Sequence, residues 1–225
     1  VVTTPVGAGR DVITEELGIV VEPDPEEIAK AIKNVKEIDR KRIRKITVEN
    51  YSFEKVAERV YNLYSTLGDI NSICYATLYA PPYELSGVGM QVYELSKRLT
   101  KFCDVHILAS RHGGGKSEEV KENIFFHRVL SLKPFLRPSY SIFSTFKGIS
   151  LPEFDLVDGR NWEGGIVAVA LAKMKKNLSV MSLRGEGALE GIWIKRLLNK
   201  YIMKRADLIT ATDRNTAEKG ERIIC

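Results

Sequence analysis

The fold is decided at residues 72–99, which read SICYATLYAPPYELSGVGMQVYELSKRL. The first eight of them, Ser72–Tyr79, form a mostly apolar run that favours a buried strand. Pro81–Met90 follows as a loop with two glycines, and apolar residues then recur at helical spacing up to Leu99. A strand, a glycine-containing loop and a helix in this order are typical of the start of a doubly wound domain.

The chain beyond this stretch repeats the alternation of strand and helix. Apolar runs predict strands at 104–109, 123–130, 155–157, 178–183 and 206–211. Helical spacing predicts helices at 88–101, 139–148, 163–176 and 188–204, and another that starts near residue 213. We therefore predict an α/β fold in which residues 72–220 form a Rossmann-like, mostly parallel sheet with helices on both faces.

Residues 1–67 alternate strands and helices on a smaller scale. Val1–Thr4 is rich in β-branched residues and predicts a buried strand, and residues 18–21 predict a second one. Helices are expected at about 25–35, 36–49 and 52–67, the first with Asp24 as its N-cap. The polar break Gly68–Asn71 separates this partial second α/β segment from the larger region.

The composition excludes several classes of protein. The apolar runs are too short to cross a bilayer. The three cysteines and three histidines lack the spacing of a disulfide framework or of metal ligands. We therefore expect a cytoplasmic protein without a metal or other cofactor.

The net charge of +5 arises mostly from Lys and Arg interleaved with Asp and Glu, but Lys195–Arg205 is a less balanced basic cluster. Basic helix faces can bind anionic lipids or nucleic acids, and a solvated helix face explains the cluster equally well. We expect no nucleic-acid partner. Peripheral contact with the cytoplasmic face of the membrane is a hypothesis that rests on charge alone.

Gly87 and Gly89 are the first candidates for a binding site. Glycines let a backbone approach a ligand closely, and the N-terminus of the helix that follows can hold an anion. A phosphate or a sugar hydroxyl could bind there. A dinucleotide fingerprint would need a third glycine at position 92, which is Val92. A tight turn needed only for packing explains the two glycines equally well.

Two further candidate clusters follow predicted strands, where open α/β sheets bind their ligands. In the first cluster, residues 158–165, Arg160 could pair with a phosphate and Trp162 could stack on a sugar ring or base beside Asn161. An N-capping loop with Trp162 in a packing role is the alternative. In the second cluster, Arg184 could face the same crevice as Arg160, or it could form an ion pair with Glu186.

Several motifs in order resemble family 4 glycosyltransferases. Residues 73–99 closely resemble the opening of the N-terminal domain of that family, and the pattern continues in 104–110, 153–162 and 206–212. Residues 1–7 resemble the strand and loop after the family's Glu-x7-Glu motif, and residues 51–57 resemble its closing helix. The resemblance implies that 1–67 is a partial C-terminal segment of a donor domain. It also implies that 72–225 is an acceptor-side, N-terminal GT-B domain, truncated at its end.

The resemblance implies transfer of a sugar from a nucleotide-sugar donor to a sugar or lipid-linked acceptor, with retention at the anomeric carbon and without a metal. The loop with Gly87 and Gly89 would lie near the donor phosphates and the acceptor, and Gly7 would lie on the donor side. Arg160 and Arg184 stand near positions where the family often has histidines. No catalytic role is therefore carried over to any residue.

The elements that hold the donor in this family, the Glu-x7-Glu carboxylates and an Arg/Lys pair, do not occur in these 225 residues. We expect a fragment that is inactive or weakly active by itself. Two other hypotheses stay open: a non-catalytic binding or regulatory module on half of a GT-B fold, and a nucleotide-dependent enzyme of another class. The missing third glycine counts against the last one.

Overall fold

The computed structural model of the protein describes residues 1–6, 9–35, 39–111, 115–185 and 193–224. Its largest feature is a seven-stranded sheet with the strand order β5-β6-β4-β3-β7-β8-β9. The neighbours in this sheet are parallel except β5, which runs antiparallel to β6. The strands are β3 (Ser72–Ala76), β4 (Asp104–Ser110), β5 (Glu118–Lys121), β6 (Ile124–Val129), β7 (Leu156–Arg160), β8 (Leu178–Leu183) and β9 (Leu208–Ala211). The predicted mostly parallel α/β fold is confirmed.

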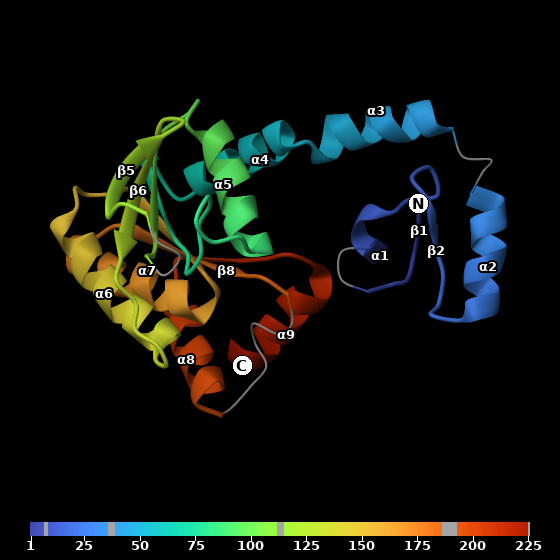
Figure 1. Ribbon diagram of the computed structural model, residues 1–225. Coiled ribbons are helices and arrows are strands. Elements are labelled where there is room, and N and C mark those ends of the chain that lie inside the picture. The colour runs from blue at the N-terminus through green and yellow to red at the C-terminus, as the bar shows by residue number, and fades with distance from the viewer. Residues whose placement is uncertain (7–8, 36–38, 112–114, 186–192, 225) are drawn as a thin grey trace.

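Helices cover both faces of this sheet (Figure 1). One face packs against α4 (Phe53–Ser65) and α5 (Gly87–Leu99). The other face packs against α6 (Leu136–Ser150), α7 (Asn161–Lys175) and α8 (Trp193–Met203), and α9 (Arg214–Ile224) lies beside α8. The sheet is therefore the middle layer of three.

The first strand, β3, shows why its sequence is apolar without alternation. Ile73 and Tyr75 are buried toward α4 and α5, whereas Cys74 and Ala76 are buried toward α6 and α7. A strand covered on both faces needs apolar side chains at every position. The helix α7 also approaches the sheet closely, because a Cβ atom on Gly164 would lie 2.2 Å from the carbonyl oxygen of Ala76.

The strand β5 was not predicted from the sequence. It reads Glu-Glu-Val-Lys and lies at the edge of the sheet, so burial imposes little apolar pattern on it. A two-residue turn joins it to β6, and both turn residues, Glu122 and Asn123, have positive φ angles of 52° and 60°. Positive φ at both positions is the geometry of the type I′ turn, which suits a tight hairpin.

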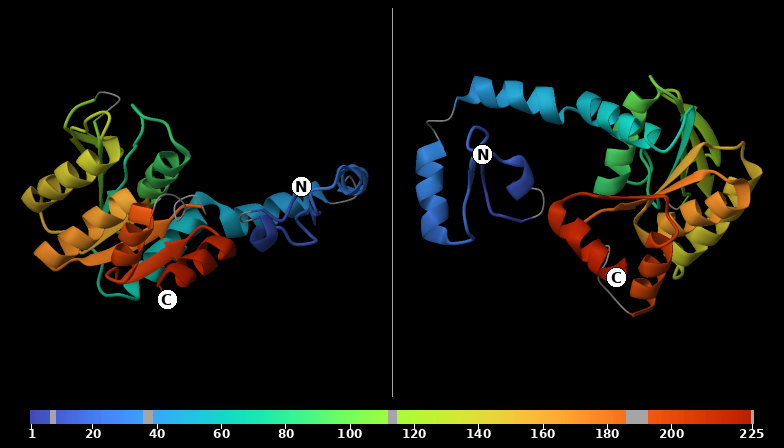
Figure 2. Two further views of the ribbon diagram at one scale, coloured as in Figure 1. Left: turned by 90° about the horizontal axis from the view of Figure 1, so that it is seen from below. Right: turned by 180° about the vertical axis from the view of Figure 1, so that it is seen from behind.

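The described residues among the first 34 form a smaller unit beside the main domain. A two-stranded parallel sheet, β1 (Val2–Thr3) and β2 (Ile19–Val20), lies near α1 (Gly9–Val12) and α2 (Pro25–Asn34). The helix α3 (Arg40–Tyr51) leads from this unit toward α4 (Figure 2). The strand predicted at Val1–Thr4 forms at Val2–Thr3, but the prediction that it is buried is wrong, since both residues are only half-buried. Within the described residues this strand pairs with β2 alone, so it lacks the cover of a central strand.

The helix α4 belongs to the main domain by its packing. Ala57 and Tyr64 are buried in the same cluster as β3 and α5, and the ring of Tyr61 stacks on Phe102 with centroids 5.0 Å apart. Ser52 caps the helix by accepting a hydrogen bond from the backbone of Lys55. The predicted helix at 52–67 therefore docks on the larger region.

Candidate functional site

The strand order places a topological switch point at β3. The chain leaves β3 through α5 toward β4, whereas β7, the other neighbour of β3, is entered through α6 on the opposite face. Ala76 pairs with Gly159, and Arg160 pairs with Ser182, so the carboxyl ends of β3, β7 and β8 lie side by side. Open α/β sheets bind ligands at such a crevice.

The loop after β3 ends at a well-formed helix N-terminus. The hydroxyl of Ser86 accepts a hydrogen bond of 2.9 Å from the backbone N–H of Gly89 and thereby caps α5. A Cβ atom on Gly89 would lie 2.5 Å from the carbonyl oxygen of Tyr79, whereas a Cβ atom on Gly87 would meet nothing within 4 Å. Packing therefore explains Gly89. An anion at this end would bind through the N–H groups of Gly87 and Val88.

The end of β7 carries a buried ionic network. The guanidinium of Arg160 lies 3.0 Å from the carboxylate of Asp158 and 4.8 Å from the ring centroid of Tyr75. Tyr64, from α4, donates its hydroxyl proton to the same carboxylate. Burial, and then the charge of Asp158, raise the pKa of Tyr64 well above its usual value, so this hydroxyl stays a donor. Burial alone would lower the pKa of Arg160, but Asp158, Tyr64 and Tyr75 together more than compensate, and the net shift is upward.

This network is not saturated within the described residues. Nε and Nη1 of Arg160 and Oδ1 of Asp158 have no hydrogen-bond partner there, although Arg160 is only 2% exposed. Buried polar atoms without partners are rare, because each one forfeits its hydration without replacement. The end of β7 therefore has unused hydrogen-bonding capacity.

Asn161 and Trp162 turn the chain from β7 into α7. Asn161 has a positive φ of 57°, a conformation that asparagine tolerates better than most residues. Its side-chain oxygen accepts a hydrogen bond of 3.3 Å from the backbone N–H of Arg184, so it ties the ends of β7 and β8 together. Arg160 points toward α4, whereas Trp162 packs on the opposite face of the sheet, toward α8. The structure brings these residues to one sheet edge but separates the two side chains.

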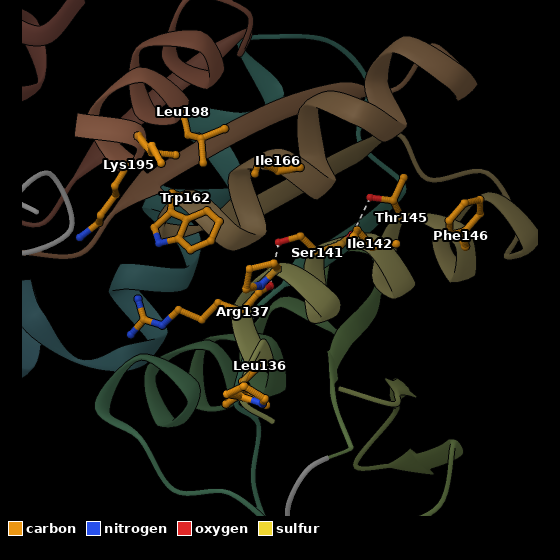
Figure 3. A pocket seen from close by; sticks show the side chains of 13 residues that line it. Leu136, Arg137, Ser141, Ile142, Thr145, Phe146, Trp162, Ile166, Lys195 and Leu198 are labelled. Carbon is orange, nitrogen blue, oxygen red and sulfur yellow. Dashed lines mark hydrogen bonds between the residues drawn. The ribbon is translucent and has the colours of Figure 1, made fainter. Parts of the chain in front are cut away.

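A groove of about 830 Å³ opens where Trp162 lies. Its walls come from α6, α7 and α8 and are mostly apolar. Figure 3 shows Trp162, Ile166 and Leu198 on one side of the groove and Ser141, Ile142 and Thr145 on the other. The sequence interpretation missed this groove, because two of its walls, α6 and α8, are more than 40 residues apart in the chain.

Glu163 is a second feature that the sequence interpretation missed. It starts α7 beside Trp162, its side chain is 5% exposed, and Arg137 lies 3.9 Å away. Burial raises the pKa of this carboxyl group above its ordinary value. Titratable groups with perturbed pKa values gather at functional sites, so Glu163 joins the candidates at the end of β7.

Two predicted site residues, Gly7 and Glu186, lie outside the described residues. Within the described residues, no group of three or more His, Cys, Asp or Glu side chains could hold a metal ion. None of the helices in the same part of the chain has both the length and the apolar character that spanning a membrane requires.

A doubly wound parallel sheet, with a glycine loop and polar strand ends at its switch point, defines a nucleotide-type α/β domain. The particular family follows from a comparison of sequences: the model of Glycosyltransferase Family 4 matches residues 85–223, more than half of the chain. The chain belongs to that family. The resemblance drawn from its motifs is therefore confirmed.

Sucrose-phosphate synthase from Thermosynechococcus elongatus has a similar structure, with a TM-score of 0.51 and 12% sequence identity. The match covers 62% of this chain and 41% of the synthase, and at this identity it shows the fold alone. A second structure of the synthase matches at a TM-score of 0.48 and 10% identity, over 65% of this chain and 79% of the other, which is too distant to support an argument. No curated protein matches the sequence.

Proposed function

We propose that this chain supplies the acceptor-side half of a retaining GT-B glycosyltransferase. The enzyme would move a sugar from a nucleotide-sugar donor to a sugar or lipid-linked acceptor. One observation carries the proposal: the strand ends that meet at the switch point, after β7 and β8, and the helix that starts at Gly87 all lie within the segment matched by the family model. The segment that matches the family therefore contains these parts of the proposed binding edge.

The site residues have distinct roles in this proposal. Gly87 and Gly89 form the loop near the donor diphosphate, where the N-terminus of α5 offers partial positive charge to the leaving group. Asn161, Trp162 and Arg184 line the acceptor side. Arg160 has two buried N–H groups that an anionic group of a substrate would satisfy if it reached the end of β7. Gly7 and Glu186 keep their predicted substrate-binding roles as part of the proposal.

We further propose that residues 1–67 are the end of a donor domain and that residues 72–225 are the acceptor-side domain. The chain spans 41% of the length of the synthase it matches, which leaves room for donor-binding elements elsewhere in a natural polypeptide. The chain by itself would then be inactive or weakly active. A cytoplasmic location, with peripheral contact to the membrane through Lys195–Arg205, completes the proposal.

The test compares this chain with any longer natural polypeptide that contains it. We expect no binding when the chain is titrated calorimetrically with UDP-, GDP- and ADP-sugars. We expect the longer protein to release nucleoside diphosphate from one of them in the presence of an acceptor. NMR of the product would report its anomeric configuration, and an inverted configuration would contradict the proposed retaining mechanism.

Tight binding of a nucleotide sugar by the chain alone would contradict the absence of a donor site. A longer protein that binds but never releases nucleoside diphosphate would favour a binding module instead. Asn161→Ala is the informative variant, because it removes the side chain that joins the ends of β7 and β8. We expect it to raise the KM for the acceptor and leave the KM for the donor nearly unchanged.

A further inference from the structure

Exposed apolar side chains are concentrated on one part of the molecular surface. Of the 23 large hydrophobic residues that are exposed in the described part of the chain, ten lie in residues 130–146 and 193–201. These two segments contain α6 and α8, which form opposite walls of the apolar groove. Scattered exposed hydrophobic residues need no explanation, but a gathered set of them marks an interaction surface.

The helix α8 has one face buried against the core and the opposite face exposed. Asn199, Ile202 and Met203 are buried, whereas Trp193 is 69% exposed and Leu197 is 58% exposed. Trp193, Leu197 and Lys200 follow one another at helical spacing on the outward face of α8, and the exposed Lys204 lies in the turn just after the helix. Exposed aromatic and apolar side chains next to exposed lysines are typical of helices that lie in a membrane interface.

The helix α6 continues the same surface across the groove. Phe146 is 68% exposed and Ile142, one turn earlier, is 54% exposed. Phe135, just before the helix, is 69% exposed. The groove of about 830 Å³ between these helices leaves room for lipid acyl chains below the two rims.

The charge of this surface has one sign. Residues 123–152 contain no Asp or Glu, and residues 191–206 contain none either. The second stretch carries five cations: Lys195, Arg196, Lys200, Lys204 and Arg205. The charged residues that line the groove are Arg137 and Lys195. A cationic rim around apolar side chains is complementary to an anionic bilayer rather than to an ordinary protein partner of mixed charge.

We infer that α6, α8 and the groove between them form a face that docks on an anionic lipid bilayer. Trp193, Leu197 and Phe146 enter the interface, and the cations of α8 lie at the level of the lipid phosphates. Trp162 lines the groove and follows the end of β7, so docking brings the binding edge of the sheet to the bilayer surface. This inference rests on the proposed function: it specifies the face and the lipid charge of the peripheral membrane contact, and it makes the acceptor a lipid-linked one.

The experiment is co-sedimentation of the 225-residue chain with vesicles, without donor or acceptor. One vesicle type is phosphatidylcholine, and the other is an equimolar mixture with phosphatidylglycerol. We expect binding to the anionic vesicles only, weakened in molar salt because screening shortens the reach of the charges. Because no sugar transfer is measured, this result stands or falls independently of the proposed enzyme activity.

Matched variants show whether vesicle binding depends on the cations of this face or on the net positive charge of the whole chain. R196A/K204A removes two exposed cations, one from α8 and one from the turn just after it, and K41A/R44A removes two exposed cations from α3. We expect the first variant to weaken binding roughly 30-fold, from about 1 kcal/mol for each cation near the surface, and the second to change it little. Equal losses in both variants would overturn the inference.

The apolar contribution has its own pair of variants. L197E places an acid on the docking face, and V48E places one at a similarly exposed position of α3, where the valine is 55% exposed. We expect only L197E to abolish vesicle binding, with unchanged far-UV circular dichroism for both. A concentration-dependent dimer that L197E disrupts, without vesicle binding by the parent chain, would assign the face to a second copy and overturn the inference.

Fluorescence gives a direct readout of insertion. The chain has two tryptophans, so W162F leaves Trp193 as the sole reporter. We expect a blue shift of Trp193 emission on anionic vesicles and quenching by brominated lipid. Emission that stays at the wavelength of water-exposed tryptophan in the bound state would contradict insertion of this face.

Discussion

Removal of one hydroxyl group at Tyr64 tests how α4 is joined to the binding edge of the sheet. Tyr64 is 2% exposed, and its hydroxyl donates to the carboxylate of Asp158, whose Oδ1 has no partner among the described residues. A hydrogen bond to a charged group contributes about 1.5–3 kcal/mol. We therefore expect Tyr64→Phe to lower the free energy of unfolding by about 2 kcal/mol, because Asp158 keeps Arg160 as its remaining partner.

The matched control is Tyr61→Phe on the same helix. Its hydroxyl donates to the backbone carbonyl of Ile70 over 3.1 Å, a neutral acceptor, and the site is partly buried. The same chemical change should therefore cost only about 0.5–1.5 kcal/mol. Comparison of the two variants removes the general effect of converting tyrosine to phenylalanine.

Urea unfolding measures both variants. With an m-value of about 1–3 kcal/mol/M, a loss of about 2 kcal/mol lowers the midpoint by roughly 1 M without changing the slope. A double-mutant cycle with Asp158→Asn should show a coupling of about 0.5–3 kcal/mol between the two side chains. If Tyr64→Phe costs no more than Tyr61→Phe, the contact with Asp158 does not hold α4 in place, and the reasoning fails.

Three further predictions follow from the same structure. Gly89→Ala should destabilise the protein by about 1–3 kcal/mol, since its Cβ would lie 2.5 Å from a backbone carbonyl oxygen. Gly87→Ala should leave the stability in urea unfolding unchanged, because its Cβ would meet nothing within 4 Å. Equal effects of the two variants would contradict the packing role of Gly89. Arg160→Met should cost about 3–5 kcal/mol in the same assay by leaving Asp158 buried without its cation, and Arg160→Met/Asp158→Leu should recover most of that loss. Burial lowers the pKa of His106 to about 4, below its value in the unfolded chain, so the stability that depends on the neutral imidazole is present above about pH 6.5 and is lost toward pH 4. We expect the free energy of unfolding to fall by on the order of 2 kcal/mol over this range, and we expect His106→Gln to reduce that fall. An unchanged pH profile in the variant would refute the assignment.

Much of the candidate site could be predicted because strand ends are marked in the sequence. An apolar run that stops at a glycine or a polar residue locates the carboxyl end of a parallel strand, and these ends share one edge of the sheet. The segments around Gly87, Arg160 and Arg184 follow such runs, and the strand register places the ends of β3, β7 and β8 side by side. The chemical roles of the individual residues stay predictions.

The direction of the side chains at that edge could not be predicted. The sequence interpretation puts Arg160 and Trp162 in one candidate cluster after a predicted strand. The strand extends to Arg160, and the positive φ of Asn161 then turns the chain between the two residues. Arg160 therefore joins the network under α4, and Trp162 joins the groove beside α8.

The sequence by itself determined the doubly wound fold and the family, because alternating apolar runs and glycine loops are local signals that each segment carries alone. Only the tertiary structure decided which distant segments meet. Tyr64 reaches Asp158 across 94 positions, and α6 and α8 close one groove although residues 151–192 separate them. Such contacts depend on how whole helices pack on the two faces of the sheet, and no short stretch of sequence encodes that packing.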